Sequence, residues 1–168
     1  MTVHETERLL LRKITADDAE FILTLLNEPA FLRYIGDKKV RNVEDARGYI
    51  LSGPVASYER HGFGLLLVEL RDSHTPIGMC GLLKREELPD PDIGFALLAD
   101  FWGKGFAFEA ARAVLQDADD RLNLQRILAI TSLDNETSIN LLQRLGFSFE
   151  KVVKLTPDGE QLRLFSRG

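Results

Sequence analysis

The chain has 168 residues, 45% of them hydrophobic and 28% charged, and a formal net charge of −5. This size and composition predict one globular domain over residues 1–168, and the acidic balance without a basic patch argues against nucleic acid as a partner. One cysteine and three histidines exclude a disulfide framework and argue against a metal site. No apolar run is long enough to span a bilayer and no secretory signal opens the sequence, so we expect a cytoplasmic protein without a membrane partner.

The N-terminal part predicts one strand followed by helices. Residues 6–13 have the composition of an opening strand. Thr15 and Asp18 have the spacing of an N-cap with its acidic partner, which predicts a helix over residues 16–26. A second helix is expected over residues 43–51, where the same pattern recurs, and a Gly-Pro pair interrupts it or separates it from another turn.

Strand signals dominate the rest of the chain. Apolar runs bounded by turn residues predict strands over residues 64–70, 77–83, 92–98, 126–131, 148–155 and 161–165. An apolar stripe of helical period predicts a helix over residues 105–121, and a shorter helix over residues 135–145 closes at Gly146. This order describes an α+β domain with a mixed, mostly antiparallel sheet of about six or seven strands and four helices.

The turn at residues 101–107, Phe-Trp-Gly-Lys-Gly-Phe-Ala, is the most informative segment. It lies between a predicted strand and a predicted helix. Bare backbone amides gather at such a helix N-terminus and form an anion site. Gly103 and Gly105 permit left-handed backbone angles and a close approach by a phosphate. The turn therefore predicts a ligand that carries phosphate.

Several motifs, in this order along the chain, resemble the GNAT N-acetyltransferase superfamily. They are Thr6-Glu7-Arg8-Leu9-x-Leu11-Arg12, Ile93-Gly94-Phe95, Trp102-Gly103-Lys104-Gly105-Phe106-Ala107-x-Glu109-Ala110, Asp134-Asn135-x-x-Ser138 and Leu145-Gly146-Phe147. The set looks most like the branch that includes ribosomal-protein alanine N-acetyltransferases. It implies a GNAT-like domain with a splay between two parallel strands, and acetyl-CoA as co-substrate.

The resemblance also implies which residues hold the coenzyme. The loop would bind its pyrophosphate, two strand residues would offer backbone groups to its pantetheine arm, and the start of the last helix would touch that arm. The residues implied are Leu97, Leu98, Trp102, Gly103, Lys104, Gly105, Phe106, Ala107, Asn135 and Ser138. Trp102 replaces the usual Gln or Arg of the loop. Asn135 is equally well explained as an ordinary N-cap.

Two residues are candidates for the chemistry of amine attack on a thioester. Asp92 stands where relatives often carry Glu, so it is a candidate general base, although a solvated loop position would also explain it. Many relatives place a Tyr as general acid where this chain has Leu142, which leaves Ser138 as the candidate that steadies the leaving thiolate. A thiol with a pKa near 8.5 leaves as its anion at a cost of about 2 kcal/mol at pH 7, so a donor is helpful but not essential.

The acceptor is predicted only as a primary amine, on a peptide N-terminus or on a small molecule such as a polyamine or amino sugar. The missing tyrosine and the short candidate base favour an α-amine, whose pKa near 8 leaves part of it neutral at pH 7. A different reading, an acyl-CoA-binding regulatory module with little turnover, also fits the departures at Asp92 and Leu142. Relatives often form dimers, so a homodimer is among the implied assemblies.

Overall fold

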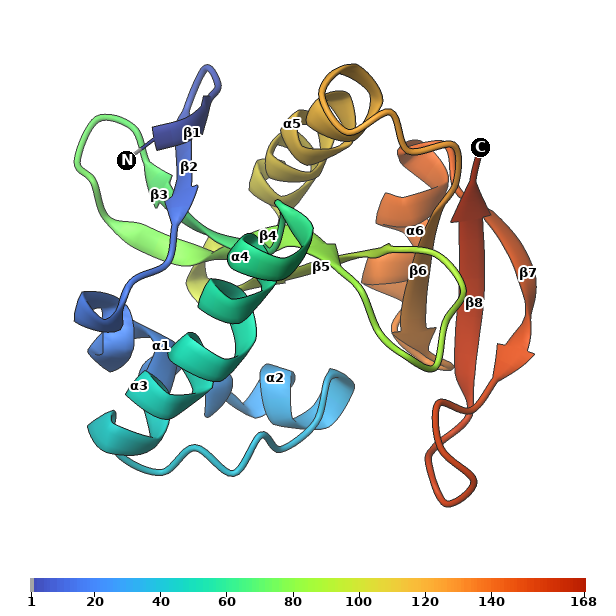
Figure 1. Cartoon of the computed structure of the whole chain (residues 1–168), viewed down its shortest axis with the longest axis horizontal. Helices are drawn as coiled ribbons and strands as arrows, with labels where there is room; N and C mark the ends of the chain where they lie inside the picture. The colour runs from blue at the N-terminus through green and yellow to red at the C-terminus, as the bar shows by residue number, and fades with distance from the viewer. Residues whose placement is uncertain (1) are drawn as a thin grey trace.

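A mixed sheet of eight strands runs through residues 2–168, the part of the chain that the computed structural model describes (Figure 1). The strands are β1 Thr2–Glu5, β2 Leu9–Lys13, β3 Leu65–Leu70, β4 Pro76–Leu83, β5 Asp92–Leu97, β6 Ile127–Ser132, β7 Ser148–Val153 and β8 Leu162–Arg167. Their order in the sheet is β1-β2-β3-β4-β5-β6-β8-β7, and every neighbouring pair is antiparallel except β5 and β6.

Helices cover both faces of the sheet. They are α1 Ala19–Leu26, α2 Pro29–Tyr34, α3 Val43–Ile50, α4 Ala56–His61, α5 Phe106–Asp120 and α6 Glu136–Arg144. Side chains alternate along β3, so Leu66 and Val68 pack in one core with α5, and Leu65 and Leu67 pack in another with α1 and α3. The central strands are therefore apolar on both faces, which explains the continuous apolar run at residues 65–68.

The structure confirms the predicted α+β class and its mostly antiparallel mixed sheet. Residues 2–168 contain one strand more than the upper predicted number of seven. The additional strand is β1, which was not predicted and which pairs with β2. Residues 6–8, predicted as part of the opening strand, form the turn between these two strands, where the Thr6 N–H donates to the Leu9 carbonyl at 2.9 Å. The predicted N-cap at Thr15, with Asp18 as its partner, and the predicted N-cap at Asn42 are both present.

The helical content also exceeds the prediction. α2 begins with Pro29 at its first position, where the missing N–H costs nothing. The predicted interruption at Gly53-Pro54 is a π-helical turn over Leu51–Val55, which carries α3 into α4 without a break. None of the helices in residues 2–168 combines the length and apolar character needed to cross a bilayer.

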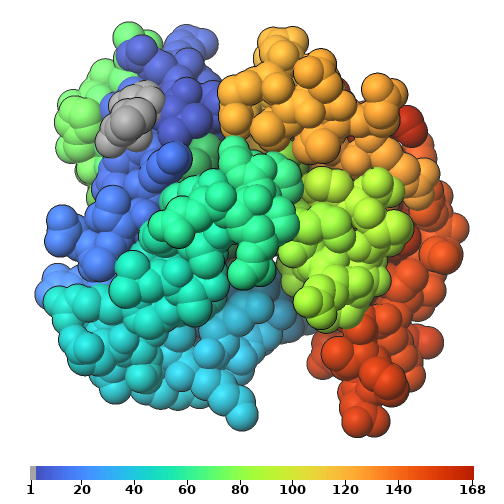
Figure 2. All heavy atoms as spheres, in the orientation of Figure 1, coloured from blue at the N-terminus to red at the C-terminus, as the bar shows by residue number. Residues whose placement is uncertain are grey.

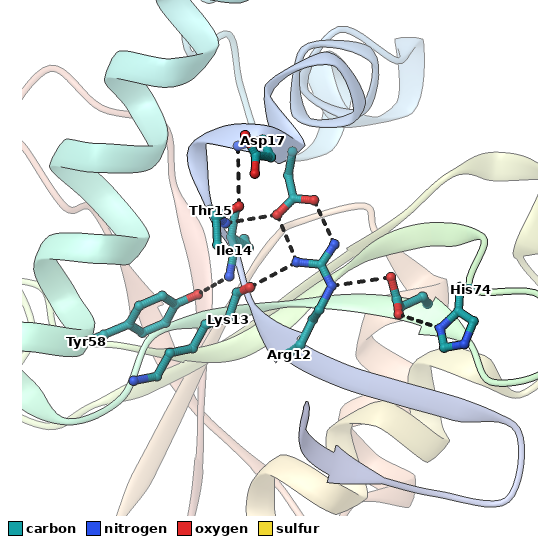
Figure 3. A network of polar contacts seen from close by, with 9 residues as sticks. Arg12, Lys13, Ile14, Thr15, Asp17, Tyr58 and His74 are labelled. Atoms are coloured by element: carbon teal, nitrogen blue, oxygen red, sulfur yellow. Dashed lines mark hydrogen bonds and ion pairs between the residues drawn. The ribbon is translucent and has the colours of Figure 1, made fainter. Parts of the chain in front are cut away.

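An ionic network fixes the start of the α1 segment against the sheet (Figure 3). Arg12 of β2 donates to both Asp18 carboxylate oxygens, at 2.7 and 3.0 Å, and to Glu69 of β3 at 3.3 Å. Asp18 also accepts from the Thr15 N–H at 2.9 Å, which completes the capping box. Burial alone would raise the pKa of Asp18, but these hydrogen bonds outweigh it and hold the pKa below its ordinary value of 3.8.

We expect Asp18→Ala to lower the free energy of unfolding by about 1 to 2 kcal/mol at pH 7, because it removes a cap and an ion pair together. A depressed pKa stabilises the fold above pH 3.8 and loses that effect as the pH falls below it. Urea denaturation should therefore show a difference between variant and wild type that shrinks in acid. Asp17→Ala is the matched control, and an equal loss in that variant would contradict the role of Asp18.

Candidate functional site

The parallel strands β5 and β6 pair at one position and then separate. Asp92 lies opposite Leu128, and the Leu128 N–H donates to the Pro91 carbonyl at 2.9 Å. No further pair joins these two strands in residues 2–168. Figure 1 shows β6 and β8 turned away from β5. The two strands therefore splay apart, paired at Asp92 and separated towards the carboxyl end of β5, and the separation between their backbones is called the slot below.

The register of β4 and β5 decides which backbone groups face the slot. The Leu98 N–H donates to the Ile77 carbonyl at 2.8 Å, so Leu98 points towards β4. Antiparallel pairing alternates, so the N–H groups of Leu97 and Phe95 point the other way, into the slot. The expectation that Leu98 offers its backbone to a ligand is thus wrong: its N–H is bonded to β4, and its carbonyl accepts from the Phe101 N–H at 2.9 Å.

Trp102 forms a hydrogen bond with the last residue of β5. Its indole N–H donates to the Leu97 carbonyl at 2.9 Å, although the side chain is 44% exposed. The bond occupies an edge carbonyl that has no partner on β6. It also fixes the path of the chain from β5 into the glycine turn, which begins at the next residue.

The glycine turn has the backbone that the sequence predicts. Gly103 has φ of +72° and Gly105 has φ of +83°, both in the left-handed region. A Cβ at Gly103 would meet no atom within 4 Å, so this surface is open. Gly105 is the N-cap of α5 and offers no side chain to the first amides of that helix. These exposed N–H groups form an anion site at the positive end of the helix dipole.

Arg8, from the turn between β1 and β2, clamps the glycine turn from outside. Its guanidinium donates to the Lys104 carbonyl at 2.9 Å and to the Glu109 carboxylate at 2.8 Å, and it lies 4.3 Å from the centre of the Phe106 ring. Glu109 also accepts from the Arg8 N–H at 2.9 Å and from the Thr6 hydroxyl. Burial alone would raise the pKa of Glu109, but these hydrogen bonds outweigh it and lower the pKa. Arg8 was not among the predicted site residues, although it belongs to the N-terminal motif that carries the family resemblance.

A basic cavity of about 290 Å³ begins beside the first turn of α5 and extends between α5 and α6. Two guanidiniums lie over the Phe108 ring, Arg144 at 4.4 Å and Arg112 at 5.8 Å from the ring centre. Arg167 also lines the cavity but is paired with Asp119 at 2.8 Å. The cavity thus offers cations and an aromatic face next to the anion site.

The opposite wall of the slot is formed by β6 and the start of α6. The hydroxyls of Thr131 and Ser132 are buried and have no hydrogen-bond partner in residues 2–168. Asn135 caps α6 by accepting the Ser138 N–H at 3.2 Å, so its side-chain oxygen is engaged while its amide N–H₂ has no partner there. Ser138 is half-buried in the first turn of α6. Leu142 is fully buried and packs in the core, so no acid occupies that position.

Asp92 lies at the closed end of the slot and is completely buried. Both carboxylate oxygens accept from Arg85 Nε, at 3.1 and 3.2 Å. Burial raises the pKa of Asp92, and the Arg85 charge offsets only part of this effect. Asp92 is therefore not the solvated loop residue of the alternative interpretation. It is a buried carboxylate about 17 Å from Leu97 along the strand.

Together these features fit an extended ligand with phosphate at one end. Strand amides without a partner on β6 face the slot, and a bare helix N-terminus follows the carboxyl end of β5. Such a ligand would complete the hydrogen bonds that the separated strands leave open.

Comparison with known proteins gives this site a family context. Residues 8–148 match the family described as acetyltransferase (GNAT) domain. The chain is 32% identical over 151 residues to the uncharacterized N-acetyltransferase YoaA of Bacillus subtilis (strain 168), a match that covers 89% of this chain and 85% of that protein.

Solved structures share the fold. An acetyltransferase from Agrobacterium tumefaciens str. C58 superposes with a TM-score of 0.83 at 24% identity, over 98% of this chain and 93% of the other. RimL, a ribosomal L7/L12 alpha-N-protein acetyltransferase solved in complex with coenzyme A, superposes with a TM-score of 0.82 at 19% identity, over 99% and 97%. Likeness at these identities shows the fold alone.

Proposed function

The chain belongs to the GNAT acetyltransferase family and is an acetyltransferase, and from this premise we propose that it moves the acetyl group of acetyl-CoA to a primary amine by direct attack on the thioester. The observation that carries the proposal is the slot between β5 and β6, with a bare helix N-terminus at its open end and a buried carboxylate at its closed end.

The open end of the slot would hold the phosphates of the coenzyme. The amides of Gly103 to Ala107 would bind the pyrophosphate, with Trp102 and Lys104 holding the loop. The N–H groups of Phe95 and Leu97 would pair with the amides of the pantetheine arm, which would take the place of the missing strand partner. The Asn135 amide would reach the same arm from α6.

The basic cavity between α5 and α6 would hold the adenosine end of the coenzyme, which carries a 3′-phosphate. Arg144 and Arg112 supply positive charge without ion-pair partners in residues 2–168, and Phe108 supplies an aromatic face. Guanidiniums recognise phosphate through paired, charge-assisted hydrogen bonds. The cavity starts beside the loop that would hold the pyrophosphate, which is the continuity that one ligand requires.

The reacting atoms would lie in the slot between Asp92 on β5 and the first turn of α6. The neutral amine attacks the thioester carbonyl carbon, the carbon–sulfur bond breaks, and the sulfur leaves as a thiolate that the Ser138 hydroxyl steadies. The amine proton passes to Asp92, through water because Asp92 is short and buried. Its raised pKa makes it a better proton acceptor than an ordinary aspartate.

The acceptor is proposed as an amine of low pKa, namely the α-amine of a peptide or of a small molecule. A peptide α-amine would agree with the resemblance of this chain to the ribosomal-protein branch of the family. No tyrosine acid is present at Leu142, and a single buried carboxylate serves as base, so an amine that is partly neutral at pH 7 needs the least help. An amine with a pKa near 10.4 would need about 3 to 4 kcal/mol more for deprotonation.

We expect Gly105→Val to abolish acetyl-CoA binding in a calorimetric titration. Its Cβ would lie 3.3 Å from Arg8 Nη2, and a β-branched residue at a φ of +83° distorts the helix start that binds phosphate. Gly62→Val is the matched control, because Gly62 has a φ of +77° and ends α4. It should cost similar backbone strain and keep the affinity. Unchanged affinity in the Gly105 variant would overturn the assignment of the loop.

Arg144→Gln should weaken coenzyme A binding about tenfold, because it removes a charge-assisted hydrogen bond to the 3′-phosphate. Dephospho-coenzyme A lacks this phosphate, so its affinity should be the same for variant and wild type. Arg47→Gln, on the exposed surface of α3, serves as the control for loss of one positive charge. If Arg144→Gln weakened the binding of coenzyme A and dephospho-coenzyme A equally, Arg144 would not be the residue that binds the 3′-phosphate.

Asp92→Asn should lower kcat/KM by roughly a hundredfold or more near neutral pH, because the amine loses its proton acceptor. The deficit should shrink at high pH, where the amine loses its proton unaided. In the wild type, activity should fall as the pH drops through the raised pKa of Asp92, which lies above 3.8. Asp90→Asn is the control, and a profile for Asp92→Asn that runs parallel to wild type at every pH would remove Asp92 from the mechanism.

A further inference from the structure

We propose that residues 28–39 form a lid over the face of the slot that the coenzyme would leave free, and that this lid opens to admit the acceptor amine. The inference rests on the proposed function, which places the phosphates of the coenzyme at the start of α5. The amine must then reach the thioester from the opposite face of the sheet. The segment that contains α2 lies on that face, because its Phe31 packs in the core with α1 and α3.

The two ends of the lid are fixed to each other. The Asn27 side-chain amide donates to the carbonyls of Leu23 and Val40, at 2.8 Å in each case. Asn27 is the C-cap of α1, and Val40 is buried shortly before α3. Arg41 also donates to the Asn27 side-chain oxygen at 3.3 Å. Residues 28–39 are therefore a loop whose ends are held together, a form of surface loop that is frequently functional.

Two polar contacts join the lid to the two walls of the slot. The Glu28 carboxylate accepts at 2.8 Å from the N–H of Ala99, which lies two residues beyond the end of β5. The Arg33 guanidinium donates at 3.3 Å to the carboxylate of Asp134, which lies two residues beyond the end of β6. The lid thus reaches from one separated strand to the other at their carboxyl ends. Figure 1 shows α2 between α1 and the tip of β6.

The lid is held less firmly than the elements around it. The side chains of Arg33 and Asp134 are both 66% exposed, and exposed ion pairs add little stability. Phe31 is the one buried side chain within residues 28–39, whereas α1 alone buries four. A helix of six residues is also too short to be stable by itself. The lid can therefore open while the two apolar cores stay intact.

The lid has a permissive backbone and free space beside it. Gly36, shortly after α2, has a φ of +127°, and a Cβ there would meet no atom within 4 Å. Residues 36–42 contain no helix or strand. Figure 2 shows the light-blue residues of this segment at the surface, with a notch between them and the red residues of the hairpin β7–β8. The lid therefore has room to move on the side where it meets the β6 wall.

Hydrogen exchange of the Ala99 amide measures the opening, because Ala99 is exposed and its N–H is bonded to a lid side chain. Arg33→Glu places a second carboxylate beside Asp134 and should raise the exchange rate of this amide about threefold to tenfold, measured by NMR on the free protein. Arg33 and Ala99 belong to different anchors of the lid, so this effect requires the lid to open as one body. Glu28→Ala sets the upper limit of the rate, since it removes the acceptor of that N–H.

Two controls separate lid opening from a general loss of stability. Arg33→Glu combined with Asp134→Arg exchanges the two charges and should return the Ala99 amide to its wild-type exchange rate. Arg47→Glu disrupts an exposed ion pair with Glu44 on α3 and should leave that rate unchanged. An Ala99 amide that exchanges equally fast in wild type and in Arg33→Glu would overturn the lid, and so would a fast rate that the charge exchange does not reverse.

Hydroxylamine tests whether the lid controls access to the thioester. The nitrogen of this small amine bonds to the carbonyl carbon of acetyl-CoA, the carbon–sulfur bond breaks, and a proton passes from nitrogen to the thiolate, which gives acetohydroxamate and coenzyme A. With protein in excess over acetyl-CoA, the closed lid should shield the thioester. Arg33→Glu should raise the rate by a factor similar to that for the Ala99 amide, because both rates depend on the same opening equilibrium.

The hydroxylamine reaction also separates the two proposals. Bound acetyl-CoA that reacts at the same rate in wild type and in Arg33→Glu would leave the proposed function standing and contradict the lid alone. Failure of acetyl-CoA to bind would contradict the proposed function, and with it the role of the lid in amine access, whatever the exchange rate of the Ala99 amide.

Discussion

The separation of β5 from β6 is the constraint on which the site depends. A sheet that stops pairing in its interior leaves strand amides and carbonyls without partners, and such groups are costly when buried. The chain resolves this in two ways. Trp102 occupies the Leu97 carbonyl, and the remaining groups face a slot that an extended ligand with amides of its own can fill.

The rest of the fold holds this separation open and positions its ends. Two apolar cores pack against opposite faces of β3 and β4. β5 therefore has a well-packed neighbouring strand, β4, on one edge only. At the open end, the Arg8–Glu109 clamp joins the first hairpin to the start of α5 and fixes the backbone of the anion site. At the closed end, Arg85 holds Asp92 in place. Each end of the slot is thus set by a guanidinium–carboxylate pair.

The sequence predicts features that depend on neighbouring residues. The left-handed angles at Gly103 and Gly105 and the capping box of Thr15 and Asp18 follow from local chemistry, and all are confirmed. The prediction for Leu98 was wrong because the direction of its N–H depends on the register between β4 and β5, which composition does not reveal. Arg8 and Glu109 are 101 residues apart, so no local signal connects them. The roles of Asp92 and Ser138 in the chemistry remain predictions.

The most direct test of the central claim is hydrogen–deuterium exchange with and without saturating acetyl-CoA. The account predicts slower exchange at the amides of Phe95 and Leu97 and at residues 105–107, because the coenzyme would accept hydrogen bonds from them. Exchange along β3, which is paired on both edges, should not change. Bound acetyl-CoA that leaves the β5 amides and the start of α5 unprotected would show that the slot is not the coenzyme site.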